Sequence, residues 1–171
     1  MNTIYEFTSP VFVKHLGGMK IVLEKTQAFL KEKGMNEEEF LQSRMWEDMF
    51  PFVKQVQISC DNAKGAVARL AGMEVPKFED NEKTITELQA RVDKTLKFVK
   101  SVPESAFEGA EERKVSLSYW NGKYMTGHDY ARFYAIPNFL FHVTTAYDLA
   151  RKAGVPVGKA DYMNGNPLKD A

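Results

Sequence analysis

The stretch from Tyr134 to Arg151 constrains the fold more than any other part of this chain, because its apolar residues fall on more than one side of a helix. At about 100° per residue, one broad apolar arc runs along the predicted helix, and Tyr134 and Phe141 form a second apolar spot on another side. A helix that is apolar on several sides is buried on several sides. We therefore expect the rest of the chain to pack around it. The broad arc consists of Ile136, Phe139, Leu140, Val143, Ala146, Tyr147 and Ala150.

A narrow polar seam lies between the two apolar surfaces of this helix. Asn138, His142 and Thr145 form it, at spacings of four and three residues that bring them onto one line of the helix surface. Pro137 falls within the same pattern. Because proline lacks a backbone donor and clashes with the preceding turn, it must kink the helix or begin a new segment there.

Three further long helices are predicted from apolar residues that recur every three or four positions. Ser9-Pro10 is typical of a helix start, since a capping hydroxyl precedes a proline that needs no donor in the first turn. Asn36 and Asn81 are predicted as caps of the next segments, and Pro51 opens the helix with the clearest apolar stripe. The predicted long helices span 9–34, 51–72 and 81–103, with a short helix from Asn36 to about Trp46 between the first two.

The pattern changes between Lys114 and Gly127, where apolar and polar residues alternate as in β-strands. Asn121-Gly122 within this segment is the dipeptide preferred for a tight hairpin turn. Thr126 and Asp129 then resemble a capping box at the start of the last long helix. Turn-forming residues crowd the tail 155–171, which is expected to be irregular. The fold class is all-α, a single domain over 1–171 built as a four-helix bundle with a small β-hairpin between helices three and four.

Composition excludes several classes of partner. Among 171 residues, 23 basic and 23 acidic side chains cancel to a net charge of zero, which argues against nucleic acid and against an anionic membrane. The N-terminal residues lack the basic and apolar regions of a secretory signal, and a cytoplasmic location is expected. The one cysteine, Cys60, lies on the apolar stripe and is interpreted as a small buried hydrophobic residue.

The polar seam is the candidate binding pocket, with His142 as the residue to test first. Gln57, Asp61 and Lys64 lie on one flank of the apolar stripe of the second long helix and would face Asn138 and His142 if those helices are neighbours. Two alternatives stay open: Asp61 and Lys64 could form a surface pair, and His142 could be a structural histidine. The complete candidate set is His142, Asn138, Thr145, Asp61, Gln57 and Lys64.

Four other residues have simpler interpretations. His15 points toward the bundle interior and is expected to be partly buried, whereas His128 is expected at the solvated surface. Gly17 and Gly18 lie inside the first helix, where each costs about 1 kcal/mol relative to alanine. We interpret the glycines as permitting close approach of another backbone, with a ligand-lining role as the alternative.

Several motifs together resemble a domain-of-unknown-function family placed in the DinB/YfiT-like superfamily of four-helix bundles. The motifs are MFPFVKQVQ at 49–57, DNAKGAVARLAGMEVP at 61–76, FED at 78–80, PNFLFHVTTAYDLAR at 137–151 and GVPVGKADY at 154–162. The resemblance extends from about Tyr5 to Tyr162. It implies a DinB-like bundle of the up-down-down-up type, and it also implies a homodimer, since members of the superfamily are often homodimeric.

Better-known members of that superfamily are metal-dependent thiol transferases or hydrolases, with one histidine on the second helix and two on the last at a spacing of four. Here the four-residue neighbours of His142 are Asn138 and Ala146, and the second long helix contains no histidine. We therefore expect no cofactor, and a homodimer that binds an unidentified small molecule or protein. The alternative is a divergent metal-dependent thiol transferase or hydrolase with a divalent metal at His142. Whether any reaction is catalysed is left open.

Overall fold

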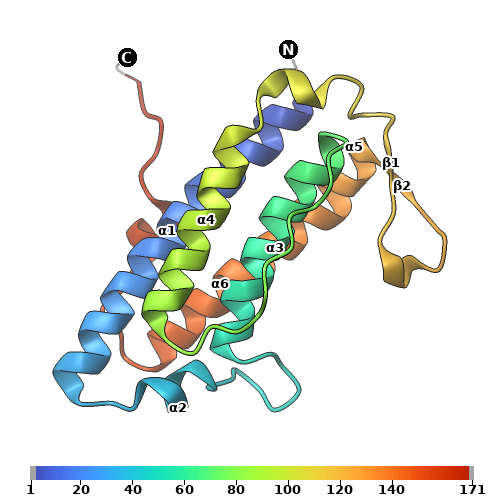
Figure 1. Cartoon of the computed structure of the whole chain (residues 1–171). Helices are drawn as coiled ribbons and strands as arrows, with labels where there is room; N and C mark the ends of the chain where they lie inside the picture. The colour runs from blue at the N-terminus through green and yellow to red at the C-terminus, as the bar shows by residue number, and fades with distance from the viewer. Residues whose placement is uncertain (1–2, 170–171) are drawn as a thin grey trace.

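The computed structural model describes residues 3–169, and four long helices form a bundle within them (Figure 1). The long helices are α1 (Thr3–Lys33), α3 (Phe52–Leu70), α4 (Ile85–Ser101) and α6 (Ile136–Lys152). Shorter helical segments are α2 (Glu37–Leu41), η1 (Glu104–Phe107), η2 (Ser118–Trp120), α5 (Gly127–Asp129), the π-helical η3 (Tyr130–Ala135) and α7 (Lys159–Met163). The strands are β1 (Lys114–Val115) and β2 (Met125–Thr126).

The four long helices pack around a shared core, and α1 and α3 also contact each other across it. Both α1 and α3 contact α4 on one side and α6 on the other. The segment 71–84 runs back along the bundle before α4 begins, so α3 and α4 point in the same direction (Figure 1). This is the up-down-down-up order. The structure confirms the predicted four-helix bundle with a small hairpin ahead of the last long helix.

The stripe predicted on the second long helix forms the centre of the core. Cys60, Ala63, Val67 and Leu70 on α3 are all fully buried. Burial raises the pKa of the Cys60 thiol to about 12, because the thiolate would lose its hydration there. The interpretation of Cys60 as a small buried hydrophobic residue is confirmed.

The predicted start of the first helix at Ser9-Pro10 is wrong, because α1 begins at Thr3 and contains Pro10. A proline inside a helix costs about 3 kcal/mol or more. Packing of the preceding turn outweighs that cost: Ile4 is only 3% exposed, and the Tyr5 ring meets the Phe107 ring edge-on at 5.3 Å. Burial that depends on distant residues cannot be recognised from a local capping pattern.

Two other boundaries also differ from the prediction. Helix α4 is capped by Thr84 rather than Asn81, because Thr84 and Glu87 form a reciprocal capping box. Helix α2 is capped by Asn36 as predicted, but it ends at Leu41, well before Trp46. Beyond Leu41 the chain turns to place Pro51 at the start of α3.

The hairpin is shorter than the alternating sequence suggests. Its strands pair Lys114 with Thr126 and Val115 with Met125, and the η2 turn occupies the part of the loop where alternation had predicted strand. Asn121 has a φ of 52° and Gly122 a φ of 79°, the left-handed conformations that an Asn-Gly turn supplies. The hairpin projects from the side of the bundle near α5 (Figure 1), while its Leu117 and Trp120 pack against the core.

The sequence predicts an irregular tail, but part of the tail is ordered as a helix. Val155 and Val157 are each 1% exposed in a small second core, and α7 follows and packs on α1. Gly18 makes this packing possible: a Cβ added there would lie 2.5 Å from the Tyr162 carbonyl oxygen. The predicted close approach of another backbone is confirmed at Gly18.

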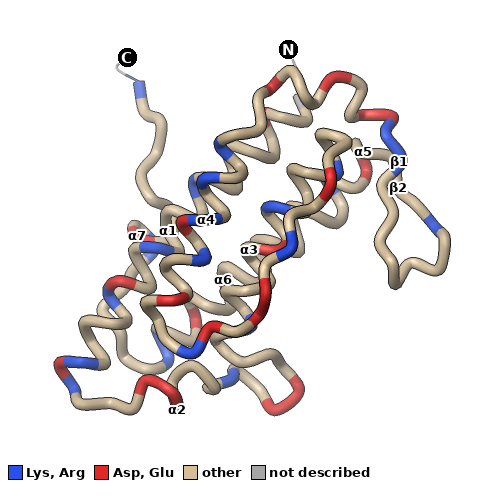
Figure 2. The backbone as a smooth tube through the Cα atoms, viewed as in Figure 1, with Lys and Arg blue, Asp and Glu red and all other residues tan. Residues whose placement is uncertain are grey.

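Charge is spread evenly over the bundle. Lys and Arg alternate with Asp and Glu along the tube without a large region of one sign (Figure 2). Within residues 3–169, no helix combines the length and the apolar character that crossing a bilayer requires.

The two adjacent glycines of α1 offer a matched test of tail docking. Gly18→Ala should destabilise the protein by about 1–3 kcal/mol, because the new methyl group meets backbone atoms that cannot move aside. Gly17→Ala is the control, since its methyl group meets only the flexible Asn164 side chain and gains helix propensity. Urea unfolding monitored by circular dichroism measures both. Equal free energies of unfolding for the two variants would contradict the prediction.

Candidate functional site

The packing of α6 against α3 brings the predicted polar seam to a buried interface. His142 is 7% exposed, and its Nδ1 lies 2.7 Å from Gln55 Oε1. Gln55 Nε2 donates to the Phe50 carbonyl oxygen at 2.9 Å, which fixes the orientation of the amide. Because Oε1 can only accept, His142 Nδ1 must carry the hydrogen. The imidazole is thereby held in one tautomer.

The other two seam residues have different partners. Asn138 Nδ2 donates to Asn62 Oδ1 on α3 at 2.9 Å. Thr145 Oγ1 donates to the Phe141 carbonyl oxygen one turn back on its own helix, at 2.8 Å. The Thr145 hydroxyl therefore donates within α6, whereas the side chains of Asn138 and His142 each form a hydrogen bond with an amide side chain of α3.

The three candidate residues from α3 face the opposite way. Asp61 Oδ1 lies 2.8 Å from Arg91 Nη2 and 3.0 Å from Lys64 Nζ, and Gln57 Nε2 donates to Glu82 Oε2 at 2.8 Å. Arg91 belongs to α4. Gln57, Asp61 and Lys64 thus face α4 and the segment 71–84, and the structure does not bring Gln57 and Lys64 to the seam.

Arg91 organises this second group. Its side chain is 2% exposed and also pairs with Asp80 at 2.8 Å and Glu82 at 2.9 Å. The Asp61–Lys64 pair exists, but it is not the solvated surface pair considered above, because the Lys64 side chain is only 6% exposed. The Arg91 guanidinium is buried and the Glu82 side chain nearly so, whereas Asp61 and Asp80 are more exposed, so removing the cation would leave the Glu82 carboxylate without its counter-ion. The group fixes the segment 71–84 to the bundle.

The side of α3 that meets α6 carries Gln55 and Asn62, and sequence reasoning missed both. On a helical projection, Gln57, Asp61 and Lys64 occupy one flank of the apolar stripe, while Gln55 and Asn62 occupy the other. Both flanks are polar, so only the handedness of helix packing decides which one faces α6. That information is absent from the periodicity of a single helix.

The Asn62–Asn138 pair lies in a cleft of about 220 Å³, which we call the tyrosine cleft. The amide nitrogen Asn62 Nδ2 is buried and has no hydrogen-bond partner. Asp61 also lines this cleft, so it reaches the vicinity of Asn138 although its carboxylate is held by Arg91. The lining residues are Ile58, Asp61, Asn62, Arg69, Leu117, Tyr119, Tyr130, Tyr134 and Asn138.

The hairpin covers one side of the tyrosine cleft. The hydroxyl groups of Tyr119 and Tyr134 are hydrogen-bonded, and the Trp120 ring meets the Tyr134 ring edge-on at 5.2 Å. Tyr130 stacks on Tyr134 at 5.7 Å. Tyr134 is therefore covered by the hairpin, whereas Phe141 is 55% exposed, so the two members of the predicted second apolar spot differ in burial.

The π-helical segment sets the position of these tyrosines. Pro137 lacks the N–H that would continue a regular helix. The segment before it is the π-helical η3, which ends with a hydrogen bond from the Ile136 N–H to the Ala131 carbonyl oxygen. The prediction that Pro137 begins a new segment is confirmed. Burial raises the pKa of both Tyr130 and Tyr134, with the Tyr119 hydroxyl adding to the effect at Tyr134. Both phenols are hydrogen-bond donors at neutral pH.

The remaining histidines agree with their simpler interpretations. His15 is half-buried with its ring 5.0 Å from the Tyr162 ring, and burial lowers its pKa. His128 lies at the surface, where its Nδ1 is 3.4 Å from Asp129 Oδ1. Neither lies on the interface between α3 and α6.

The seam does not fit a divalent metal. Zinc and its neighbours prefer imidazole, thiolate and carboxylate ligands, three or four at a time. Here one imidazole and three amides occupy the interface, and His142 Nδ1 and the two asparagines are engaged with one another or with Gln55. Nowhere in residues 3–169 do three His, Cys, Asp or Glu side chains gather in a way that could hold a metal ion.

The bundle order, the hairpin and the position of the seam define a DinB-like helical bundle. A crystal structure of a DinB family member protein from Shewanella denitrificans is similar to this chain at 40% sequence identity and a TM-score of 0.93, covering 98% of this chain and 95% of that one. The family model described as Domain of unknown function (DUF1993) matches residues 4–163, and the chain belongs to that family. Among curated proteins, the comparison finds no match.

The buried imidazole predicts a pH-dependent stability. Burial lowers the pKa of His142 below its usual value of 6.5, so at mildly acidic pH the unfolded chain binds more protons than the folded one. The stabilisation is complete above that value and is lost as the pH falls. Between about pH 7.5 and about pH 5 the free energy of unfolding should decrease in the wild type and decrease less in His142→Gln, where an amide can replace the Nδ1 donor.

Urea unfolding at a series of pH values measures this difference. His15 has a pKa lowered in the same direction, so His142→Gln should retain part of the dependence. His128→Gln, which replaces an exposed imidazole, is the matched control. Identical pH dependence in His142→Gln and His128→Gln would contradict the assignment.

Proposed function

We propose that this protein is a homodimeric, cytoplasmic binding module without a catalytic metal, and that the tyrosine cleft receives a small molecule. The observation that carries the proposal is the buried Asn62 Nδ2, a donor that lacks a partner beside a cleft lined with further polar groups. An unsatisfied buried donor costs about 1–3 kcal/mol, and a ligand oxygen would recover that free energy. The neutral overall charge supports a partner other than nucleic acid.

The lining of the cleft defines the chemistry of the ligand. The amide of Asn62 and the guanidinium of Arg69 both donate, and the ring of Tyr134 offers an apolar surface. A volume of about 220 Å³ is below the usual range for drug-sized ligands and admits a molecule no larger than a single substituted ring. A small planar molecule with a carbonyl or carboxylate group fits these features.

The alternative of a metal-dependent thiol transferase or hydrolase receives less support from this geometry. It needs Asp61 and His142 to act together, but Asp61 is bound by Arg91 and Lys64 on the opposite flank of α3. His142 Nδ1 is bound by Gln55. We therefore propose binding rather than metal-assisted chemistry for this seam.

Binding in the cleft is tested with benzamide and benzoate as probes, by chemical-shift changes in ¹H–¹⁵N correlation spectra. Asn62→Asp keeps the acceptor for Asn138 and removes the free donor, so binding of benzamide should weaken about tenfold. Tyr119→Phe removes a hydroxyl group in the cleft, and Tyr124→Phe, an exposed tyrosine of the same hairpin, is its control. Shifts confined to residues outside the cleft, or equal affinity in Asn62→Asp, would count against the proposal.

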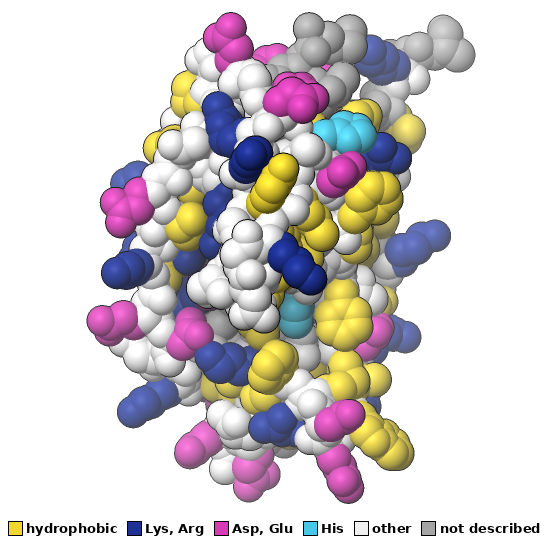
Figure 3. Space-filling model, turned by 90° about the vertical axis from the view of Figure 1, so that its right-hand side faces the viewer, with side chains coloured by type: hydrophobic (Ala, Val, Ile, Leu, Met, Phe, Trp, Pro, Cys, Tyr) yellow, Lys and Arg dark blue, Asp and Glu magenta, His cyan; other side chains and the backbone are white. Residues whose placement is uncertain are grey.

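The homodimer is proposed from an exposed aromatic row on η3 and α6. Phe133 is 65% exposed and Phe141 55% exposed, and the exposed Pro137 lies midway between them at four-residue spacing. Apolar and charged side chains lie side by side on the face drawn in Figure 3. A second copy can cover such a row with the same row of its own, which is the self-complementary arrangement of a two-fold dimer.

Light scattering after gel filtration measures the assembly. Wild-type protein at micromolar concentration should show twice the chain mass of 19.5 kDa. Phe141→Glu should shift the mass to that of one chain, because it places a charge in the dimer interface. Phe50→Glu changes a residue of nearly equal exposure in a different region, and it should leave the mass unchanged. A wild-type mass equal to one chain would remove the dimer from the proposal.

A further inference from the structure

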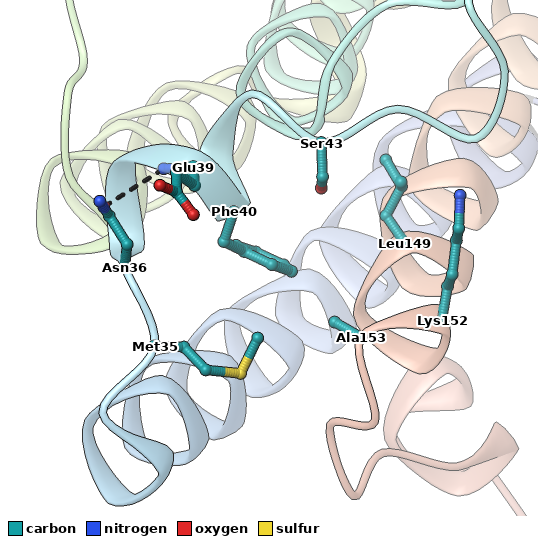
Figure 4. A pocket seen from close by; sticks show the side chains of 8 residues that line it. All are labelled: Met35, Asn36, Glu39, Phe40, Ser43, Leu149, Lys152 and Ala153. Carbon is teal, nitrogen blue, oxygen red and sulfur yellow. Dashed lines mark hydrogen bonds between the residues drawn. The ribbon is translucent and has the colours of Figure 1, made fainter.

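A second cavity lies at the end of the bundle that α2 closes, remote in sequence from the tyrosine cleft (Figure 4). We call it the end pocket. Its volume of about 410 Å³ falls within the usual range for small-molecule sites. The side chains that line it come from the loop after α1, from α2 and the loop that follows, and from the last turns of α6. They are Met35, Asn36, Glu39, Phe40, Ser43, Leu149, Lys152 and Ala153.

Two side chains of the apolar wall of the end pocket are packed into the core. Phe40 is 5% exposed with its ring 4.6 Å from the Phe52 ring, and Leu149 is 2% exposed. Helix α2 is fixed at its start, where Asn36 Oδ1 accepts the Glu38 N–H at 2.9 Å. The pocket is therefore preformed, which lowers the entropic cost of binding.

Ser43 places an unused polar group in this apolar surrounding. Its hydroxyl oxygen is buried without a hydrogen-bond partner, and it points toward the space between Phe40 and Leu149 (Figure 4). The backbone of Ser43 is fixed on both sides: its N–H donates to the Phe40 carbonyl oxygen, and its carbonyl oxygen accepts the Phe52 N–H, each at 2.9 Å. The hydroxyl is thus held in place by the loop and lacks only a partner.

Lys152 supplies positive charge at the edge of the end pocket, beyond Leu149 in Figure 4, and is hydrogen-bonded to the residue that follows Ser43. Its Nζ donates to the Arg44 carbonyl oxygen at 3.1 Å, which leaves two of its three donors for a ligand. No carboxylate forms an ion pair with Lys152 within the described part of the chain. Glu39 lies at the other end of the pocket, beside Asn36 (Figure 4). The two ends therefore differ in charge.

We propose that the end pocket binds a small amphiphilic monocarboxylate, a fatty acid of medium length or an arylalkanoic acid. The carboxylate accepts hydrogen bonds from the Ser43 hydroxyl and from Lys152 Nζ, the charge-assisted geometry that makes such bonds strong. The apolar body lies against Met35, Phe40 and Leu149. Glu39 repels a second carboxylate at the far end, so the site discriminates against dicarboxylates.

Isothermal titration with octanoate tests the proposal on the full-length protein. Octanoate should bind, whereas octylamine and the dicarboxylate suberate should bind at least about tenfold more weakly. Lys152→Met keeps the length of the side chain and removes its charge, so it should weaken octanoate about tenfold and leave octanol unchanged. Lys97→Met, an exposed lysine of α4, is the matched control. Ser43→Ala should weaken octanoate about threefold or more.

Two further measurements keep the outcome decisive. Ala153→Leu should abolish octanoate binding by filling the pocket, and urea unfolding verifies that each variant folds. Chemical-shift changes should centre on α2 and the last turn of α6, whereas changes at Tyr134 would place octanoate in the tyrosine cleft. Equal affinity for octylamine and octanoate, or undiminished octanoate binding by Lys152→Met, overturns the proposal. The end pocket is independent of the tyrosine cleft, so failure of one leaves the other standing.

Discussion

The interface between α3 and α6 is the constraint on which the rest of the structure depends, because it buries polar groups that must find partners inside the protein. A buried polar group without a partner costs more than a hydrogen bond returns, so the two helices can pack in only one register. His142 opposite Gln55 and Asn138 opposite Asn62 define that register. The apolar stripe of α3 supplies the burial energy but would tolerate other alignments, whereas these directional pairs would not.

The same requirement explains why the seam differs from a metal centre. Imidazole groups from facing helices can share a cation, but amide groups satisfy each other directly. Gln55 holds His142 in one tautomer and is itself held by the Phe50 carbonyl oxygen at the start of α3. Among the buried side-chain polar atoms of this interface in residues 3–169, Asn62 Nδ2 lacks a hydrogen-bond partner, and this donor lies beside the tyrosine cleft.

Most of the fold could be predicted from the sequence, and the failures have a common cause. Helical periodicity identified α3, α4 and α6, and Asn121-Gly122 identified the hairpin, because these signals are local. Pro10 resembles a helix start in the local sequence, but the burial of Ile4, which extends the helix to Thr3, depends on the tertiary fold. The turn residues of the tail predict irregular structure, whereas α7 is short and depends on Gly18 for its place on α1.

The candidate site was predicted in part for the same reason. Asn138 and His142 were found because a polar line between apolar surfaces is visible on a single helix. Gln57 and Lys64 do share one flank of α3, but that flank faces α4 and the segment 71–84 instead of α6, since periodicity fixes which residues share a face but not which neighbour that face meets. The end pocket cannot be recognised in the sequence, because its lining comes from separate segments that come together only in the folded bundle.

Helix α6 contributes residues to the tyrosine cleft, to the end pocket and to the exposed aromatic row at Phe141, and it holds the three apart. Asn138 in the tyrosine cleft and Lys152 in the end pocket are separated by roughly 20 Å along the axis, at about 1.5 Å of rise per residue. A small ligand cannot span that distance, so one molecule cannot occupy both cavities. Their linings also differ, because one offers amide and phenol donors and the other an apolar wall with a cation. Phe141 lies between them on the exposed side of the helix. A partner that covers this side would rest on the same rigid helix that lines both cavities, which places ligand binding and assembly on one structural element without requiring them to share a residue.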